Sequence, residues 1–577
     1  MRIANLPVSV VAARLLPTRW DLLVVPLLLV AFVLLAHGAR QMAQPLTALD
    51  VTPLTLDPAA LPGYALRTTL RMLAALVLSI LVTFTYGTLA AKSRRAGALL
   101  VPLLDILQSV PILGFLSFTV TFFLGLFPGN VLGAECAAIF AIFTSQAWNM
   151  GFSFYQSLRS VPRDLDEVTR SFGLSAWQRF WRLEVPFSIP GLVWNTMMSM
   201  SGGWFFVVAS EAISVGKTTI ALPGIGSYVA LAIAERNLAA VGWAVLAMLL
   251  VILLYDQFLF RPIVAWAEKF RFEQTASGEA ARSWFLTVLR RSLWVRWMTA
   301  PLRRRLRRAM RKRSVFPRLA AVQPGVALST QTVDWIWYGV LGLLALYAAW
   351  HVYAFVFSEL GWLDLLQALG LGALTLLRVV VLIALATLIW VPIGVWIGQR
   401  PRLAEALQPL AQFLAAFPAN LMFPVAVVVI VRYRLHPDIW LSPLMVLGTQ
   451  WYILFNVIAG TTAFPGDLKE AAASMRLTGW PWWRNVMLPG IFPYYITGAI
   501  TASGGSWNAS IVAEVASWGD THLAAHGLGA YVAQATDGGD YPRLVLGIAV
   551  MSFYVVALNR TVWRPLYAFA EQRLRAN

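Results

Sequence analysis

Long apolar runs recur along this chain, separated by short polar segments. Each run is close to the length of about 20 residues that a transmembrane helix needs. Six runs form a first set at about 20–37, 67–91, 98–127, 130–150, 187–210 and 237–260. Six more form a second set at about 335–357, 372–398, 405–431, 438–460, 488–512 and 541–562. The pattern predicts an all-α polytopic membrane protein with twelve transmembrane helices.

Composition supports a membrane protein and excludes a soluble one. Hydrophobic residues make up 59% of the 577 residues and charged residues 12%, whereas an average globular chain is roughly 25% charged. No compact soluble fold of this size has enough interior to bury that much apolar surface. The single cysteine, Cys136, excludes an intrachain disulfide and a cysteine-based metal site.

The basic residues orient the spans. With a cytoplasmic N-terminus, the first set has 14 Lys/Arg on inner segments and 5 on outer ones, and the second set has nine and four. This is the distribution that the positive-inside rule requires, so both termini are expected in the cytoplasm. The first run lacks a small-residue cleavage site and is expected to be an anchor, not a removed signal.

A strongly basic segment, 272–330, joins the two sets and carries +11 of the net charge of +18. We expect a cytoplasmic linker that lies on anionic lipid. Aromatic and aliphatic residues interleave with arginines between Trp284 and Trp297, which predicts a helix in the membrane interface. Nucleic-acid binding is the alternative for a basic run, but no other part of a nucleic-acid-binding fold accompanies this one.

The two sets of spans are copies of one another. Early positions match at an offset of 307 residues and later positions at an offset of 303. Matched pairs include Arg71 with Arg378, Pro111 with Pro418, Trp148 with Trp451, Glu211 with Glu514, Gly226 with Gly529 and Arg261 with Arg564. Such a sustained spacing indicates an internal repeat. We therefore divide the chain into a first repeat (1–271), the linker (272–330) and a second repeat (331–577), in parallel orientation with a pathway between them.

One polar segment in each repeat is too long for a simple turn. It follows the fourth span, at 162–186 in the first repeat (the first loop segment) and at 465–489 in the second (the second loop segment). Each has a glutamate, a glycine position six residues later and a proline thirteen residues beyond that. The second loop segment has Arg476 at the glycine position and Gly479 three residues later, which leaves open whether its turn is shifted.

The composition of both loop segments suits docking onto a partner. Early acids favour the positive end of a short helix, a glycine permits a sharp bend, and bulky aromatic residues are typical interface anchors. These aromatic residues are Trp177, Phe180 and Trp181 in the first segment and Trp480, Trp482 and Trp483 in the second. An amphipathic interfacial loop without a partner is the alternative, but two copies in register favour docking.

The loop segments resemble the EAA loop of permease subunits of ABC-type importers. Glu470, Ala471 and Ala472 match that name literally, and Glu167 begins a looser copy. The resemblance extends over nearly all of both repeats and is strongest to permeases of the nitrate, sulfonate, taurine and bicarbonate type. It implies ATPase-coupling roles for Asp166, Glu167, Gly173, Trp177, Pro186, Glu470, Ala471, Ala472, Arg476, Gly479 and Pro489.

The resemblance also implies the function and the partners. The chain would be two permease units of a type I ABC importer, fused in one chain, in a bacterial inner membrane. Two ATPase subunits would grip the loop segments from the cytoplasm, and a periplasmic or lipid-anchored binding protein would deliver a small solute, such as nitrate, a sulfonate or taurine. Transport would proceed by alternating access, and the chain itself would bind no cofactor and catalyse nothing.

Polar residues within the spans are candidates for the pathway, because an unpaired charge at mid-bilayer costs at least roughly 2.5–3.5 kcal/mol. The repeated glutamates Glu211 and Glu514 are the strongest of these. Weaker candidates are Ser201, Trp204, Ser503 and Trp507, and the remaining ones are Asp105, Gln108, Glu135, Gln146, Arg378 and Gln412. Structural pairing, or placement near the lipid boundary, is the alternative role for each. We do not expect the glutamates to bind an anionic substrate directly.

Two local patterns resemble other sites. Gly216-Lys217-Thr218 looks like the end of a phosphate-binding loop, but Glu211 stands where the motif requires a glycine. His522 and His526 have the spacing of metal ligands on a helix but no evident third ligand. The sequence thus predicts neither a nucleotide site nor a metal site.

Two other functions remain open from the sequence. An ion-gradient-driven secondary transporter can also have twelve spans in two parallel halves, but it has no reason to repeat a cytoplasmic loop between spans four and five. A sensor or scaffold that only binds an ATPase is the third possibility.

Overall fold

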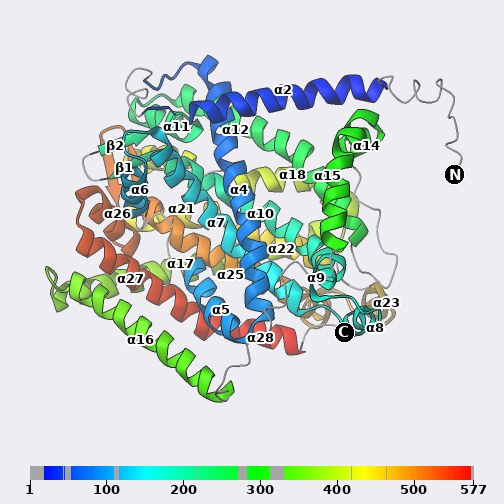
Figure 1. The fold of residues 1–577 in the computed structure, drawn as a ribbon. Helices are drawn as coiled ribbons and strands as arrows, with labels where there is room; N and C mark the ends of the chain where they lie inside the picture. Colours follow the sequence, from blue (N-terminus) through cyan, green and yellow to red (C-terminus); the bar gives the residue numbers. More distant parts are fainter. Residues whose placement is uncertain are drawn as a thin grey trace, which may run out of the picture.

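The computed structural model describes residues 18–42, 44–45, 53–109, 116–215, 218–270, 283–311, 330–417, 419–462, 464 and 466–573. Within these residues the chain is helical apart from two short β-hairpins, and the helices pack around one another in a single body (Figure 1). The all-α class predicted from the sequence is confirmed.

The helices and strands of the first repeat fall within residues 19–270. In chain order they are α2 (Arg19–Gln41), α4 (Leu61–Lys92), α5 (Arg94–Ser109), α6 (Leu116–Leu126), α7 (Val131–Arg159), α8 (Arg163–Ser171), α9 (Ala176–Arg179), α10 (Val185–Glu211), β1 (Ala212–Val215), β2 (Thr218–Ala221), α11 (Ile225–Ala234), α12 (Leu238–Tyr255) and α13 (Arg261–Ala267). The linker contributes α14 (Trp284–Arg291) and α15 (Leu293–Arg311). The rest of the linker, 272–282 and 312–329, lies outside the described residues.

The second repeat has the same order of elements. They are α16 (Thr330–Val356), α17 (Trp362–Gly398), α18 (Pro401–Ala416), α19 (Phe423–Arg432), α20 (Pro437–Trp440), α21 (Ser442–Leu447), α22 (Trp451–Thr462), α23 (Gly466–Ser474), α24 (Gly479–Trp482), α25 (Leu488–Ala513), β3 (Val515–Trp518), β4 (Thr521–Ala524), α26 (Leu528–Gly538), α27 (Tyr541–Leu558) and α28 (Arg564–Arg573). Each hairpin is antiparallel, with Ala212 opposite Ala221 and Val515 opposite Ala524.

The repeat extends to fine details of the backbone. Rare π-helical turns lie at Phe180–Glu184 and Asp256–Phe260, and again 303 residues later at Trp483–Met487 and Asn559–Trp563. Helix starts are shared as well. The side chains of Asn237 and Asp540 accept backbone N–H bonds that cap α12 and α27.

The predicted spans are reproduced only in part. Seven helical segments in the described residues are long and apolar enough to cross a membrane, and they correspond to α2, α4, α7, α12, α16, α17 and α27. Three of these segments extend beyond the named helix: that of α4 is Pro58–Lys92, that of α12 is Leu238–Ala267, and that of α27 is Tyr541–Ala570. The bent pair α20–α21 and α22 can add an eighth, with an angle of 41° at the break. α10 and α25 are not among them. The count of twelve spans stays a prediction.

Three expected spans are not single straight helices. The run 98–127 contains α5 and α6, the run 405–431 contains α18 and α19, and the run 438–460 is the bent pair. In the second of these, Phe417 is extended (ψ 120°) where it ends α18. The following residue is Pro418, and a residue before proline disfavours the helical conformation. Pro418 therefore explains why the helix stops there.

The two repeats pack through reciprocal contacts. α5 of the first repeat contacts α27 of the second, and α18 of the second contacts α12 of the first. Since α5 matches α18 and α12 matches α27 in the repeat, both contacts join the same pair of elements. Each repeat also has a large apolar core of its own, to which a few side chains of the other repeat are added.

The linker packs on the first repeat. Phe285 and Val288 of α14 are buried, and the ring of Phe285 lies 4.9 Å from that of Phe258. α14 also contacts α13 and α2. Its apolar face therefore covers the first repeat, and α15 continues from it (Figure 1).

Candidate functional site

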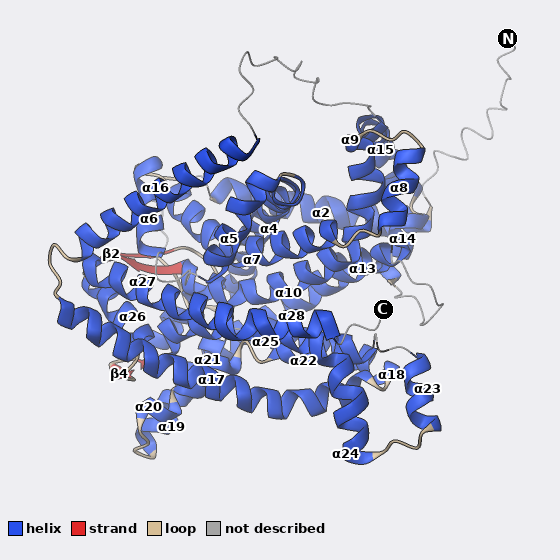
Figure 2. Cartoon of the chain, turned by 90° about the horizontal axis from the view of Figure 1, so that it is seen from below, coloured by secondary structure: helices blue, strands red, loops and turns tan. Residues whose placement is uncertain are grey.

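The two loop segments lie at the same end of the molecule. Figure 2 shows α8, α9, α23 and α24 gathered at one end and the strands of the two hairpins at the other. Each segment consists of a short helix, a tight turn, a second short helix and a π-helical turn that continues into α10 or α25. Any force applied to a segment therefore reaches the central helix of its repeat through continuous backbone.

The turn of the second loop segment is not shifted. Gly173 adopts a left-handed conformation (φ 63°), and Arg476, at the matching position, does the same (φ 51°). The closing hydrogen bonds also match: Leu174 N donates to Thr169 O, and Leu477 N donates to Ala472 O. Gly479 is also left-handed (φ 62°) but lies at the start of α24. The second segment thus keeps the register of the first, with an arginine in a conformation that favours glycine.

One exposed apolar side chain lies at the end of the first short helix in each loop segment, and the sequence analysis did not identify either. Phe172 is 78% exposed and Met475 is 73% exposed, and they occupy equivalent positions 303 residues apart. The glutamates Glu167 and Glu470 are exposed on the same helices. What distinguishes these two residues from other exposed apolar residues is that they recur at the same position of both loop segments. The signal in the sequence was the repeat offset of 303 residues, which pairs a large apolar residue at 172 with another at 475.

Ion pairs connect the first loop segment to itself and to α4, and the described residues of the second segment form no equivalent pairs. Lys92 Nζ lies 2.6 Å from Glu184 Oε2, and Asp166 pairs with Arg170 at 2.7 Å and with Arg179 at 3.1 Å. Asp166 is thus engaged within the segment. The matching positions in the second repeat are occupied by Gln399, Met487, Lys469, Ala473 and Trp482. These residues cannot form the same pairs.

The predicted aromatic anchors have different environments. Phe180 packs edge-on against Phe154, and Trp181 lies 6.3 Å from Phe84, so both rings face α4 and α7. Trp177 is half-buried, whereas Trp480 is largely exposed. Pro186 and Pro489 lie in the first turns of α10 and α25. Ala472 is buried, while Ala471 is exposed.

Glu211 belongs to a buried ion network at the opposite end of the first repeat. Arg71 Nη1 donates to Glu211 Oε1 at 2.6 Å, and Arg71 Nε donates to Glu135 Oε2 at 2.5 Å. Thr68 Oγ1 donates to Glu211 Oε1 at 2.7 Å. All these groups are buried. The network joins α4, α7 and α10, so the charges expected within the spans are paired with one another.

Glu514 is held in the same way in the second repeat. Arg378 donates to Glu514 Oε1 at 3.0 Å and to Asp438 Oδ1 at 3.2 Å, and Thr375 Oγ1 donates to Glu514 at 2.9 Å. Asp438 also accepts a hydrogen bond from His526 N. Asp438, Thr68 and Thr375 were not among the sequence candidates. The offsets that match Arg71 with Arg378 and Glu211 with Glu514 also match Glu135 with Asp438 and Thr68 with Thr375.

The same glutamates explain the Gly-x-Gly pattern that follows each hairpin. The Glu211 carboxylate accepts a hydrogen bond from Gly226 N at 2.6 Å, at the positive end of α11. A Cβ at Gly224 would overlap this carboxylate, and a Cβ at Gly226 would lie 2.7 Å from Val208 Cα. Gly527 and Gly529 are in the same relation to Glu514 and α25. The glycines are therefore needed for the close approach of the carboxylate and the neighbouring helix.

The weaker pathway candidates lie inside their own repeats. Trp204 is buried, and its Nε1 donates to the hydroxyl of Tyr255 at 3.0 Å. Trp507 is buried and stacked on Tyr554 at 6.2 Å. Ser201 and Ser503 are buried as well, and Ser201 lines a small cavity beside Tyr255. Their role in a pathway stays a prediction.

Other candidates have structural partners or lie outside the description. Gln146 is buried and accepts a hydrogen bond from Ser79. The side chains of Asp105, Gln108 and Gln412, and the residues Gly216 and Lys217, lie outside the described residues. Among the described residues, no group of three or more His, Cys, Asp or Glu side chains could hold a metal ion.

Comparison with known proteins identifies a repeated domain. The family model described as "Binding-protein-dependent transport system inner membrane component" matches residues 83–260 and again 390–575. Both matches include a loop segment and the glutamate of the buried network. The twofold match agrees with the internal repeat in the sequence.

Individual relatives are similar to one part of the chain. The nitrate import permease protein NrtB of Leptolyngbya laminosa is 26% identical over 190 residues, which is 33% of this chain and 64% of the relative. The bicarbonate transport system permease protein CmpB of Synechococcus elongatus is 26% identical over 188 residues, again 33% and 64%. The glycine betaine/proline betaine transport system permease protein ProW of Escherichia coli is 30% identical over 190 residues, 33% of this chain and 50% of the relative. The chain spans less than two thirds of the length of these relatives.

Proposed function

Because the chain belongs to the family of inner membrane components of binding-protein-dependent transport systems, we propose that it translocates a small solute by alternating access, driven by separate ATPase subunits. As an ABC importer permease with two fused units, it is a non-catalytic transport subunit, and ATP is bound by a partner ATPase. The observation that carries the proposal is the repeated pair of loop segments at one end of the molecule.

Each loop segment is the docking element for one ATPase subunit. On the first segment the contacts are made by Glu167 and its neighbours up to the turn at Gly173, and on the second by Glu470, Ala471 and the turn at Arg476. The exposed side chains of Phe172 and Met475 support this assignment, since they offer an apolar contact at the same position of both loop segments. ATP binding draws the two ATPases together, and α10 and α25 carry the motion into the repeats.

The two repeats have the same orientation, with both termini on the cytoplasmic side of a bacterial inner membrane. The reciprocal packing of α5 on α27 and of α18 on α12 supports a pseudo-twofold relation between them. Each of the repeats, 1–271 and 331–577, crosses the membrane six times, which gives twelve spans. A solute-binding protein then docks at the opposite end, near the hairpins.

The solute is a small anion such as nitrate, a sulfonate or taurine. The names of the relatives NrtB and CmpB, for nitrate and bicarbonate, support an oxyanion, whereas the name of ProW supports a zwitterion. The buried glutamates are engaged by Arg71 and Arg378, so they do not present free carboxylates that would repel an anion.

The test is the double variant Glu167→Ala with Glu470→Ala, expressed with its native partners. We expect it to reach the membrane, to lose copurifying ATPase and to lose uptake of the solute. The matched control is Glu235→Ala with Glu359→Ala, which removes two exposed acids outside the loop segments. Normal ATPase retention and uptake in the loop variant would refute the docking role, and uptake that needs a proton gradient but not ATP would favour a secondary transporter.

A further inference from the structure

The last turn of the linker helix α15 is seated on the first loop segment. Trp177 Nε1 donates to the backbone oxygen of Ala309 at 2.9 Å, and Gln178 Nε2 donates to that of Arg311 at 2.9 Å. Two side chains of α9 thus bond to backbone carbonyl groups in the last described turn of α15.

The other end of α15 is fixed to α2. Asp21, in the first turn of α2, accepts hydrogen bonds from Ser292 Oγ at 2.5 Å and Trp294 N at 2.9 Å, and it is buried. Arg291 lies over the ring of Trp20. α15 thus spans the distance between the start of α2 and the first loop segment, and it is held at both ends.

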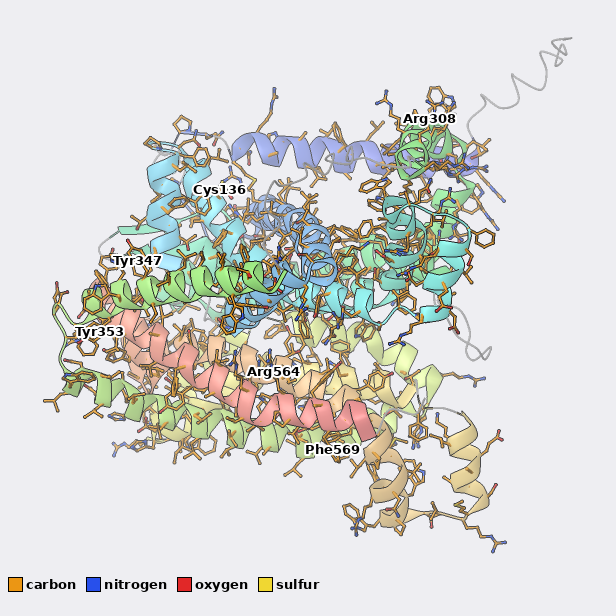
Figure 3. All side chains as sticks on the ribbon, turned by 60° about the horizontal axis from the view of Figure 1, so that its bottom comes forward. Cys136, Arg308, Tyr347, Tyr353, Arg564 and Phe569 are labelled. Carbon is orange, nitrogen blue, oxygen red and sulfur yellow. The ribbon has the colours of Figure 1, made fainter. Side chains whose placement is uncertain are left out.

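Between these ends, one side of α15 is apolar and is exposed in the part of the chain that the structure describes. Trp294, Met298, Leu302 and Leu306 are spaced by four residues and lie on one side of the helix. The last three are 61%, 59% and 48% exposed. The helix also carries seven arginines and no acidic residue. Figure 3 shows one of them, Arg308, at the outer edge of the molecule.

An anionic lipid surface fits this face. α2 is apolar and is exposed along most of its length, as expected of a helix in lipid. α15 begins beside the first turn of α2 and crosses its direction (Figure 1), so it lies where a membrane surface would be. An apolar stripe on an arginine-rich helix binds the boundary between headgroups and acyl chains, and the arginines favour anionic headgroups.

Among the described residues, the second loop segment has no matching hydrogen bonds with α15. The positions that match Trp177 and Gln178 are Trp480 and Pro481. The proline side chain has no hydrogen-bond donor, and the Trp480 side chain is largely exposed. Contact with α15 therefore distinguishes the two otherwise equivalent segments.

We propose that α15 binds anionic lipid and so braces the first loop segment, and not the second, in the position that receives its ATPase. This inference rests on the proposed function, because it assigns a partner and a regulatory input to the same docking element. Anionic lipid holds the helix against the membrane, and the helix holds α9. Without the lipid, α15 is held less firmly, and the first segment binds its ATPase more weakly.

The test measures the affinity of the ATPase, purified with the permease from its native membranes, for permease reconstituted in lipid nanodiscs. One set of discs contains phosphatidylcholine only, and the other contains equal parts of phosphatidylcholine and phosphatidylglycerol. We expect about fivefold tighter binding in the anionic discs. This factor corresponds to the net contribution of two weak hydrogen bonds, here those from Trp177 and Gln178 to α15. Replacing Arg303, Arg304, Arg307 and Arg308 by glutamine should remove the difference and leave binding in neutral discs unchanged.

A matched pair of variants separates the two loop segments. Trp177→Phe removes the N–H donor to α15 but keeps an aromatic ring, and we expect it to reduce the lipid difference. Trp480→Phe makes the same change at the matching position, and the difference should persist. Equal binding in both kinds of disc would overturn the brace. If replacing the four arginines weakened ATPase binding equally in both kinds of disc, the arginines would be a contact for the ATPase. That result would also overturn the brace.

A second readout does not depend on the ATPase. A bimane label at Leu302→Cys, in a Cys136→Ser background, should shift its emission to the blue in anionic discs. Cys136 lies on α7, away from α15 (Figure 3). The same label at Arg307→Cys, on the opposite face, should shift less, and equal or absent shifts would contradict lipid binding. Failure of the proposed function would show differently, as absence of ATPase binding in either lipid.

Discussion

Arg71 Nη1 lies 2.6 Å from Glu211 Oε1 at a site where neither side chain is exposed. Glu135 completes the network from the other side of the guanidinium group. Removing one member of such a network leaves an unpaired buried charge and typically costs about 3–5 kcal/mol. We expect Arg71→Met to lower the free energy of unfolding by about that amount, measured by denaturant unfolding in detergent.

The control for this prediction is an exposed ion pair between the repeats. Arg236 Nη2 lies 2.7 Å from Asp520 Oδ2, and both side chains are open to solvent. Exposed pairs contribute roughly 0–1 kcal/mol, so Arg236→Met should have a much smaller effect. Equal losses for Arg71→Met and Arg236→Met would contradict the structural role of the buried network.

Gly226 should not tolerate a side chain. A Cβ at this position would lie 2.7 Å from Val208 Cα, which is backbone and cannot move aside freely. Overpacking of this kind costs about 1–3 kcal/mol, so we expect Gly226→Ala to reduce thermal stability. Gly504→Ala is the control, because a Cβ at Gly504 would have no atom within 4 Å. A fully stable Gly226→Ala protein would show that α11 does not pack on α10 as described.

Replacing Arg476 by glycine should stabilise the turn of the second loop segment. Its left-handed backbone costs an L-residue roughly 1–2 kcal/mol, and part of the gain from glycine is offset by the entropy of the unfolded chain. We expect Arg476→Gly to slow amide hydrogen exchange at the turn of the second loop segment. The reciprocal change, Gly173→Arg, should speed exchange in the first, and unchanged exchange in both variants would refute the shared turn geometry.

Phe172 and Met475 should contribute to ATPase binding. Truncating a side chain at the centre of an interface costs about 2 kcal/mol or more when that side chain is an anchor. We therefore expect Phe172→Ser and Met475→Ser each to weaken ATPase retention by more than tenfold, without loss of membrane insertion. Tyr433→Ser, at an exposed aromatic residue outside the loop segments, is the control. Retention equal to that of Tyr433→Ser would exclude both residues from the interface.

The sequence predicted those features that depend on local pattern. Apolar runs indicated the helical class, the matched offsets indicated the repeat, and the spacing from Glu167 to Pro186 indicated the loop segments. The same offset also predicts the register of the second turn, although Arg476 departs from the motif. Its backbone conformation is imposed by the hydrogen bonds of the turn, which an arginine side chain does not prevent.

Tertiary contacts could not be derived in the same way. The pairing of Arg71 with both Glu135 and Glu211 joins three helices that are far apart in the chain. The contact of Trp177 with Ala309 crosses 132 residues and involves a backbone oxygen, which has no signature in the sequence. The bend between α21 and α22 was also missed, because the apolar run continues through it.

The proposed function depends most directly on contact between both loop segments and ATPase subunits. The direct measurement is site-directed cross-linking of the intact complex, with Phe172→Cys or Met475→Cys as the single cysteine in a Cys136→Ser background. We predict that each cysteine forms an adduct with an ATPase subunit in membranes. Cysteines that form no such adduct, or that react with an impermeant maleimide from outside the cell, would contradict it.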